Sequence, residues 1–302
     1  MGAEPEVRVV VVTYHSGEVI GTFLDTLAKA TSRPYEVVIA DNSPKLDEGT
    51  AVAGNRPETR LLRTGSNLGY GAAANRGAAG AATPWLLISN ADIAFRPGAL
   101  DELLDAEARW PSAGVLGPGI INPGGVLYPS ARALPSLGRG TGHALLGWCW
   151  PTNPWTASYR NERGAPREQA TGWLSGSCQL VRRVAFEGVR GFDESYFMFM
   201  EDVDLDRRIG LAGWQNVYVP TAVVEHLGGH STQRTSRRMV IAHHRSLYRY
   251  LCRQYAGPAW MPLRCALGAA LAARLVVALV FAKDSAGAAA TRSAELLENS
   301  AP

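Results

Sequence analysis

The first forty residues alternate between two hydrophobic patterns. Residues 7–12 are β-branched apart from Arg8, which is typical of a strand buried on both faces of a parallel sheet. Residues 18–30 carry apolar side chains at helical spacing, and residues 35–40 are again strand-like. A strand, a helix and a second strand within about 35 residues predict a βαβ unit with a right-handed crossover.

The same alternation continues along the chain. Further strands are predicted at 60–63, 85–89 and 216–219, further helices at 71–82, 97–109 and 202–211, and regular structure of unspecified type at 178–181. Parallel strands with helices between them predict an α/β fold with a mostly parallel, doubly wound, Rossmann-like sheet. Residues 138–166, rich in tryptophan and proline, predict an irregular lobe.

The C-terminal part differs in character. Residues 239–255 have a basic amphipathic helical pattern, and residues 265–282 contain one charged side chain, Arg274. The basic flanks favour an interfacial helix that lies on a bilayer. A buried helix or a dimer contact explains the apolar residues equally well, so a homo-oligomer stays open.

Composition narrows the class of protein. Hydrophobic residues make up 46% and charged residues 19%, as in a globular domain, and a net charge of +3 gives no indication of nucleic-acid binding. Four cysteines occur singly, without zinc or redox spacing, and residues 1–6 lead into a strand without a secretory signal. We therefore expect a cytoplasmic protein.

Polar side chains follow the predicted strands. Because ligands of open α/β sheets bind at the carboxyl ends of strands, Thr13, Asp41, Asn90 and Asp92 should converge on one crevice. A carboxylate such as Asp41 can accept the imide N–H of a uracil or thymine base, although a helix cap or Asx turn also explains this residue.

The motifs that follow along the chain are typical of sites that bind a diphosphate and a metal ion. Residues 67–77 form a glycine-rich turn that leads into a helix, where backbone N–H groups favour an anion. Asp92 follows an apolar strand, as expected for a carboxylate that holds Mg²⁺ or Mn²⁺ together with substrate phosphate. His226 could supply an imidazole ligand to the same ion.

A cluster of acids begins the helix predicted at 202–211. Four carboxylates occupy residues 201–206, directly after an aromatic run. Acids in a first helical turn are stabilised by the helix dipole, but four exceed what a cap requires. One of them could take the proton from an attacking hydroxyl as general base.

The order of these motifs resembles a known family. Val-Thr-Tyr, Asp-Asn-Ser, Asn-Leu-Gly-Tyr-Gly, Asn-Ala-Asp, Trp-Leu-Ser-Gly, Glu-Asp-Val-Asp-Leu and Val-Glu-His follow one another over roughly residues 7–235. The combination resembles bacterial family 2 glycosyltransferases of the rhamnosyltransferase type, which have the GT-A fold. The resemblance implies a catalytic domain at 1–238, with a nucleotide-sugar half at about 1–110 and an acceptor half at about 111–238. A helical, membrane-proximal segment at 239–302 follows.

The resemblance also implies roles for individual residues. Asp202 would be the base of an inverting transfer, Asp92 and His226 would bind the metal, and the donor would contact Thr13, Tyr14, Asp41, Asn42, Asn67, Gly69, Gly71, Asn75 and Asn90. Trp173, Gly176 and Glu201 would shape the sugar and acceptor site. Many relatives have Asp-x-Asp where this chain has Asn90-Ala-Asp92, so Asn90 would coordinate through its amide oxygen.

The resemblance is strongest to enzymes that transfer rhamnose from dTDP-L-rhamnose to polyprenyl-diphospho-N-acetylglucosamine in cell-wall linker assembly. Such an enzyme would be peripheral on the inner face of the cell membrane. UDP-galactofuranose, UDP-glucose and GDP-sugars stay open as donors. A non-catalytic sugar-nucleotide-binding protein is the alternative from another class, and a nucleotidyltransferase is disfavoured because residues 13–17 lack its basic glycine-rich signature.

Overall fold

The computed structural model describes residues 4–135, 166–228 and 237–298, the last of these as backbone only from 280. The chain divides into two compact units. The N-terminal unit contains Met1–Phe197 and Glu201–Ser231, and the C-terminal unit contains Met198–Met200 and Thr232–Pro302. The lobe predicted at 138–166 lies outside the described residues except for Pro166.

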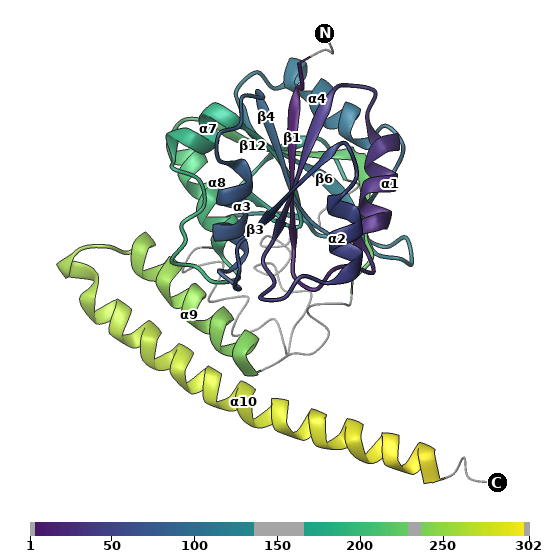
Figure 1. The fold of residues 1–302 in the computed structure, drawn as a ribbon. Coiled ribbons are helices and arrows are strands. Elements are labelled where there is room, and N and C mark those ends of the chain that lie inside the picture. The colour runs from purple at the N-terminus through teal and green to yellow at the C-terminus, as the bar shows by residue number, and fades with distance from the viewer. Residues whose placement is uncertain (1–3, 136–165, 229–236, 299–302) are drawn as a thin grey trace. The chain divides into compact units, whose positions relative to one another are not determined.

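A ten-stranded mixed sheet forms the centre of the N-terminal unit (Figure 1). Its main order is β3-β2-β1-β4-β11-β6-β12-β5; β3, β2, β1 and β4 are parallel, as are β6 and β12, and β11 runs antiparallel between β4 and β6. The strands are β1 (Val7–Thr13), β2 (Tyr35–Asp41), β3 (Thr59–Arg63), β4 (Trp85–Asn90), β5 (Ile93–Phe95), β6 (Ala113–Ile121), β7 (Leu127–Tyr128), β9 (Gln169–Thr171), β11 (Cys178–Arg182) and β12 (Gln215–His226). A separate pair joins β8 (Ala131–Arg132) to β10 (Trp173–Leu174). The predicted α/β fold is confirmed.

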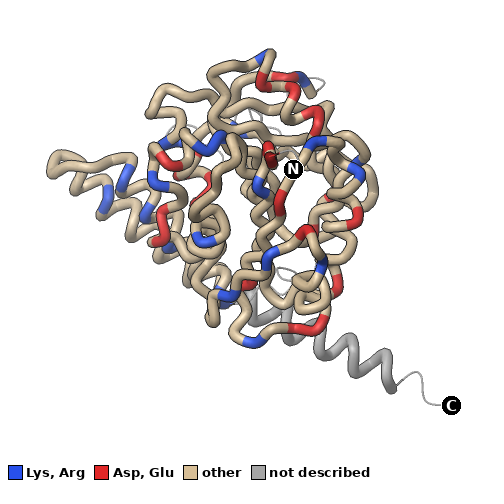
Figure 2. Tube along the Cα trace, turned by 45° about the horizontal axis from the view of Figure 1, so that its top comes forward, with Lys and Arg blue, Asp and Glu red and all other residues tan. Residues whose placement is uncertain are grey.

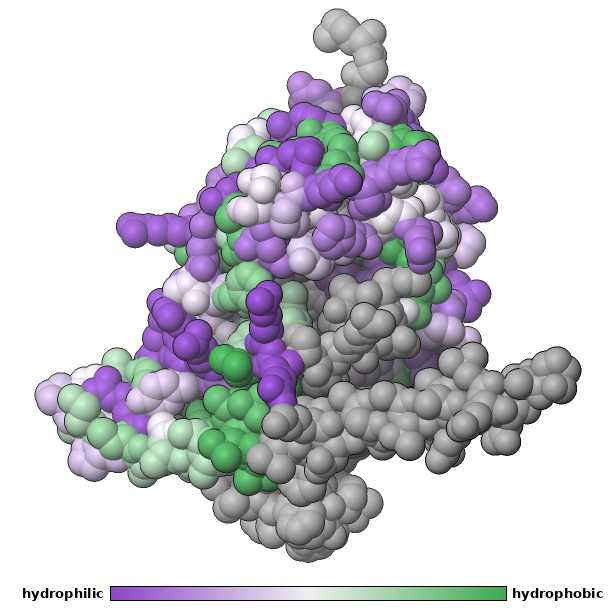
Figure 3. Space-filling model, turned by 60° about the horizontal axis from the view of Figure 1, so that its bottom comes forward, coloured by the Kyte–Doolittle hydropathy of each residue, from purple (hydrophilic) through white to green (hydrophobic). Residues whose placement is uncertain are grey.

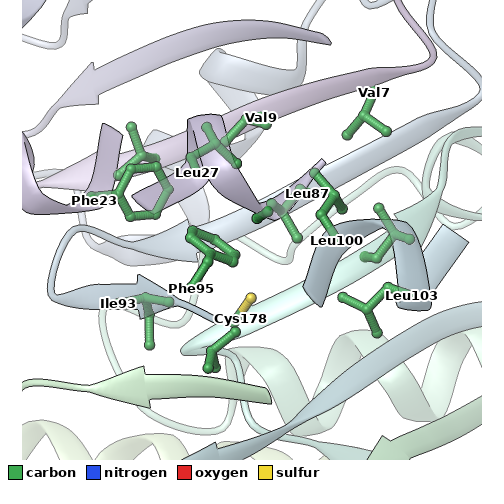
Figure 4. Close-up of a cluster of buried hydrophobic side chains, with 14 of the residues drawn as sticks. Val7, Val9, Phe23, Leu27, Leu87, Ile93, Phe95, Leu100, Leu103 and Cys178 are labelled. Carbon is green, nitrogen blue, oxygen red and sulfur yellow. The ribbon is translucent and has the colours of Figure 1, made fainter. Parts of the chain in front are cut away.

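Helices cover both faces of this sheet, which places the core in two layers (Figure 1). One face carries α1 (Ile20–Ala30), α2 (Glu48–Gly54) and α4 (Ala99–Arg109). The other face carries α3 (Tyr70–Ala78), α7 (Arg183–Gly188) and α8 (Glu201–Leu211). On the first face the rings of Phe23 and Phe95 meet edge to face at 5.3 Å within a cluster of fully buried aliphatic side chains (Figure 4).

Among the long strands, β6 and β12 differ most from the sequence-based expectation. No element was predicted at 113–121, yet β6 lies near the middle of the sheet. Its Gly117 explains the difference: a Cβ there would lie 2.5 Å from the Leu174 side chain, so packing requires a residue with low strand propensity. The strand predicted at 216–219 continues through a bulge to His226, so this histidine lies within β12 and does not follow the strand.

The C-terminal unit contains α9 (Arg237–Gln254), a short 3₁₀ turn η1 (Pro258–Trp260) and α10 (Met261–Glu298), which is longer than the helix predicted at 265–282. The Ser246 hydroxyl donates to the Met198 carbonyl at 2.9 Å. Phe199 and Met200 both have a φ of 67°, a strained conformation for side chains of this size. These residues directly precede Glu201, the first residue of α8.

The core accounts for a first prediction. Leu103 on α4 is fully buried, whereas Leu211 at the end of α8 is 72% exposed. Leu103→Ala should lower the free energy of unfolding by about 2–5 kcal/mol, because the substitution removes apolar contacts and leaves a cavity. Leu211→Ala should change it by less than about 0.5 kcal/mol. Urea unfolding measures both, and equal midpoints for the two variants would show that the core is assigned wrongly.

Candidate active site

Strand register brings three predicted site residues to one edge of the sheet. Thr13 pairs with Asp41 across β1 and β2, and Val12 pairs with Asn90 across β1 and β4. All three strands are parallel, so their carboxyl ends lie together, where open α/β sheets bind ligands. Thr13, Asp41 and Asn90 therefore adjoin one another as expected.

Asp41 is a fully buried carboxylate with several donors. Its Oδ1 accepts from the Thr13 hydroxyl and the Ser43 amide, both at 3.2 Å, and its Oδ2 accepts from Arg63 Nε at 3.2 Å. The sequence analysis missed Arg63. Arg63 is the last residue of β3 and pairs with Asp41, so its position at a strand end was the available signal.

Asn42 shapes the glycine-rich turn. Its amide donates to Asn67 Oδ1 at 3.0 Å and to the Gly69 carbonyl at 3.2 Å, and its Oδ1 accepts from the Leu68 amide at 2.9 Å. A Cβ on Gly69 would lie 2.3 Å from the Phe197 carbonyl oxygen. The φ of Gly69 is 91°, so both the backbone conformation and the packing require glycine here.

Two further residues of the predicted donor site have structural partners. Asn75 Oδ1 accepts from the Phe192 amide and its Nδ2 donates to the Phe192 carbonyl, both at 2.9 Å, so Asn75 ties α3 to the loop before α8. A Cβ on Gly71 would lie 2.8 Å from the Phe192 side chain. Tyr14 is 40% exposed beside the edge of the sheet. Contact of these residues with the donor stays a prediction.

Asp92 and His226 face each other. His226 Nε2 lies 3.1 Å from Asp92 Oδ1, and the Leu227 amide donates to the Asp92 carbonyl at 2.9 Å. Pairing of Ile93 in β5 with His226 in β12 fixes this approach across 134 residues of sequence. Within the described ranges no group of three or more His, Cys, Asp or Glu side chains could hold a metal ion. Metal binding by Asp92 and His226 stays a prediction, and an ion held by so few protein ligands would take its others from substrate phosphate and water.

The four acids of α8 separate into two kinds. Asp204 pairs with Arg208 at 2.7 Å, and the fully buried Asp206 accepts from the Leu174 amide at 2.7 Å. These two hold α8 in place. Asp202 instead accepts from the Gly176 amide through Oδ2 at 2.9 Å and from the Val203 amide through Oδ1 at 2.8 Å.

Glu201 and Asp202 are adjacent carboxyl groups in a poorly solvated region. Burial raises the pKa of Asp202, while hydrogen bonds from the Gly176 and Val203 amides oppose that rise. Burial and the charge of Asp202 raise the pKa of Glu201 to about 8. Glu201 Oε2 is buried and has no hydrogen-bond partner among the described residues. Burial without a donor favours the neutral form of Glu201, whereas the two amide donors favour the ionised form of Asp202, so Asp202 is the better candidate for a base.

Trp173 and Gly176 lie close to these acids. A Cβ on Gly176 would lie 3.0 Å from Asp202 Cβ, so glycine is needed for the approach. The Trp173 ring is 8% exposed, and the Arg132 guanidinium lies 5.4 Å from its centroid. Arg132 also lowers the pKa of Asp202. The sequence analysis missed this arginine because β8 is only two residues long.

Tyr70, the first residue of α3, lies between the two groups of acids. Burial raises the pKa of its phenol well above the usual value, and the charges of Glu201, Asp202 and Asp92 raise it further. The Asn90 amide donates to the Ser177 carbonyl at 2.9 Å, and the neighbouring Gly176 amide donates to Asp202 at 2.9 Å. These two bonds link the carboxyl end of β4 to the candidate base.

Comparisons with known proteins identify a family and a relative. The profile of glycosyl transferase family 2 matches residues 8–190. N-acetylglucosaminyl-diphospho-decaprenol L-rhamnosyltransferase of Mycobacterium tuberculosis (strain ATCC 25618 / H37Rv) is 50% identical over 277 residues, which cover 88% of this chain and 90% of that protein.

Solved structures share the fold. Mannosyltransferase PcManGT from Pyrobaculum calidifontis, in complex with GDP-Man and Mn²⁺, matches with a TM-score of 0.57 and 18% identity, over 98% of this chain and 79% of that one. GalNAc-T7 with UDP, GalNAc and Mn²⁺ matches with a TM-score of 0.55 and 17% identity, over 74% and 43%. At these identities the comparison supports the GT-A fold and no individual residue role.

The raised pKa of Glu201 predicts a pH-dependent stability. When a carboxyl group has a higher pKa in the folded chain than in the unfolded chain, the folded protein becomes less stable as pH rises from the unfolded to the folded pKa. The melting temperature of the wild type should therefore fall relative to Glu201→Gln between about pH 5 and about pH 8. Calorimetry measures this difference, with Glu58→Gln at an exposed position as control. A constant difference across this range would refute a buried neutral Glu201.

Proposed function

Because the chain belongs to glycosyl transferase family 2 and is a glycosyltransferase, we propose that it transfers L-rhamnose from dTDP-L-rhamnose to N-acetylglucosaminyl-diphospho-polyprenol. The observation that carries this proposal is 50% identity, over nearly the whole chain, with a relative whose name gives both rhamnose and this type of acceptor. The Asp92–His226 pair, and the link from the end of β4 through Ser177 and Gly176 to Asp202, support a catalytic role over mere binding of a sugar nucleotide.

The donor would bind along the carboxyl ends of β1, β2 and β4. Asp41 would accept the imide N–H of the thymine base, since its carboxylate is buried and held in place by Thr13 and Arg63. The turn fixed by Asn42 and Asn67 would lie beside the diphosphate. In this assignment residues 1–110 form the nucleotide-sugar half and residues 111–238 the acceptor half of the catalytic domain.

Asp92 and His226, with the amide oxygen of Asn90, would hold a divalent cation, Mg²⁺ or Mn²⁺. Both matched structures are complexes with Mn²⁺, and a carboxylate and an imidazole that face each other suit such an ion. When bound, the cation neutralises the charge that develops on the departing dTDP.

Asp202 would act as the base of an inverting transfer. Its carboxylate takes the proton from the acceptor hydroxyl as that oxygen forms a bond to the anomeric carbon of rhamnose. The bond from this carbon to the β-phosphate oxygen breaks in the same step, and dTDP leaves with the bonding electrons. Amides of Gly176 and Val203 hold both carboxylate oxygens in place. One base is sufficient, because inversion requires no covalent sugar–enzyme intermediate.

The base assignment gives a direct prediction. Asp202→Asn should lower kcat by at least about a thousandfold, because the amide cannot take the proton, and should leave dTDP binding near the wild-type value. Rapid-quench kinetics and calorimetric titration with dTDP measure the two quantities. Asp204→Asn, which breaks the Arg208 pair on the same helix, is the control for helix damage. An active Asp202→Asn enzyme would refute the role of Asp202.

Product formation tests the proposed substrates. The full chain is incubated with dTDP-L-rhamnose and a polyprenyl-diphospho-N-acetylglucosamine analogue, with Mg²⁺ or Mn²⁺ present and then chelated. The proposal requires a rhamnosylated lipid that forms only with metal. If the sugar is transferred from UDP-galactofuranose, UDP-glucose or a GDP-sugar and not from dTDP-L-rhamnose, the protein is a glycosyltransferase but the proposed donor is wrong.

A lipid acceptor suggests that the C-terminal unit contacts a membrane. Residues 227–283 contain no Asp or Glu, and the segment formed by α9 and the start of α10 carries blue but no red positions in Figure 2. Arg245, Arg249 and Arg253 are exposed at four-residue spacing on α9. Pro258–Leu279 is long and apolar enough to cross a membrane, and its most apolar stretch is not buried (Figure 3). We infer that this unit binds the anionic inner face of the cell membrane, with α10 in contact with lipid.

Charge reversal tests this membrane contact in the full chain. Arg245→Glu, Arg249→Glu and Arg253→Glu together should abolish flotation with phosphatidylglycerol vesicles, since each arginine near an anionic surface contributes about 1 kcal/mol. The control changes net charge equally at the exposed Lys45, Arg60 and Arg167. Unchanged flotation of the α9 variant would exclude this surface. A dimer in light scattering without vesicle binding would instead assign α10 to self-association.

A further inference from the structure

Tyr70 makes one hydrogen bond across a long stretch of sequence. Its hydroxyl donates to the Gly176 carbonyl at 2.7 Å, over a separation of 106 residues. The ring packs edge to face against Phe192, with centroids 6.0 Å apart, and the Tyr70 amide donates to the Phe197 carbonyl at 3.2 Å. Ring and backbone therefore fix the phenol independently of its hydroxyl.

Both polar backbone groups of Gly176 make hydrogen bonds. Its N–H donates to Asp202 Oδ2 at 2.9 Å, while its carbonyl accepts from Tyr70. The two groups belong to the two peptide planes that meet at the Gly176 Cα, and because glycine itself restrains these planes little, the two hydrogen bonds together set its backbone conformation. A Cβ at residue 176 would lie 3.0 Å from Asp202 Cβ and 3.2 Å from its Oδ2, so a larger residue would crowd this acid.

We propose that Tyr70 is a positioning residue for the base: its hydroxyl fixes the Gly176 peptide so that the neighbouring N–H points at Asp202. The inference rests on the proposed function only in taking Asp202 as the base. Tyr70 begins α3 directly after Gly69, so its hydroxyl also joins the glycine-rich turn to Gly176. The position of the glycine-rich turn then affects the position of Asp202 through Tyr70 and Gly176.

The titration of Asp202 distinguishes a positioning role of the Tyr70 hydroxyl from a purely structural one, in which the bond to Gly176 only satisfies a buried donor. Asp202 is surrounded by Glu201 and Asp206 of α8, Tyr70 of α3 and Arg132 of β8. The hydrogen bond from Gly176 lowers the Asp202 pKa against the effect of burial. If loss of the Tyr70 hydroxyl lets the Gly176 peptide rotate, that bond weakens and the Asp202 pKa rises. A hydroxyl with a purely structural role would leave the pKa unchanged.

The test compares Tyr70→Phe with Tyr35→Phe in the full chain. Both substitutions remove one hydroxyl, and Tyr35 lies at the opposite end of the sheet, where it pairs with Val7. In Tyr70→Phe we expect kcat to fall about tenfold, with the KM of donor and acceptor within about twofold. The acid limb of the kcat profile should move to higher pH, because the base is lost as pH falls through its pKa. Tyr35→Phe should match the wild type.

A second measurement does not depend on activity. Carboxyl ¹³C NMR follows the titration of Asp202, assigned from the signal missing in Asp202→Asn, and the pKa should be higher in Tyr70→Phe by about half a pH unit. An unchanged Asp202 titration in a folded Tyr70→Phe protein would overturn the proposal, whatever its activity. A raised pKa in a chain that transfers no sugar would retain the positioning role and refute the proposed function.

Discussion

The parallel register of β2, β1 and β4 is the constraint on which the site depends. It places the ends of three buried strands side by side, so that Thr13, Asp41 and Asn90 meet without any long loop. Hydrogen bonds between strands and burial on both faces fix this register, because a slip by one residue would turn the apolar side chains away from the core. Asp41 can then remain fully buried, since the same strand ends supply its donors.

Glycine residues allow the segments near this edge of the sheet to pack closely against α8 and the loop before it. Gly69 approaches Phe197, Gly71 approaches Phe192 and Gly176 approaches Asp202, each at a distance that a Cβ would obstruct. The glycine-rich turn is thus a packing element as well as a candidate anion site. Burial raises the pKa of Asp202, and backbone amides restrain its carboxylate, so the candidate base is held in place and weakly solvated.

Local patterns predicted much of the fold and part of the site. The β-branched run of β1 and the amphipathic pattern of α1 are strong signals, because each element buries a continuous apolar face. Asp41 and Asp92 could be located from strand ends alone. The motif order also indicated the family, which residue patterns taken singly would not have done.

Other features depend on contacts between distant segments. β6 was missed because its glycines are set by the side chains of α8 and β10, which no local pattern records. Arg63, Arg132 and Tyr70 escaped notice because their partners lie elsewhere in the sequence, 106 residues away for Tyr70. Asp204 and Asp206 looked equivalent to Asp202, and only their hydrogen bonds separate structural acids from the candidate base.

The central claim is that one site contains Asp41, the Asp92–His226 pair and Asp202. A crystal structure of the full chain with dTDP and Mn²⁺, measured for anomalous scattering at the manganese edge, tests it most directly. The account predicts one manganese bound by Asp92 and His226, with the thymine base on Asp41 and the diphosphate between them. A nucleotide bound away from Asp41, or manganese held without Asp92 and His226, would contradict it.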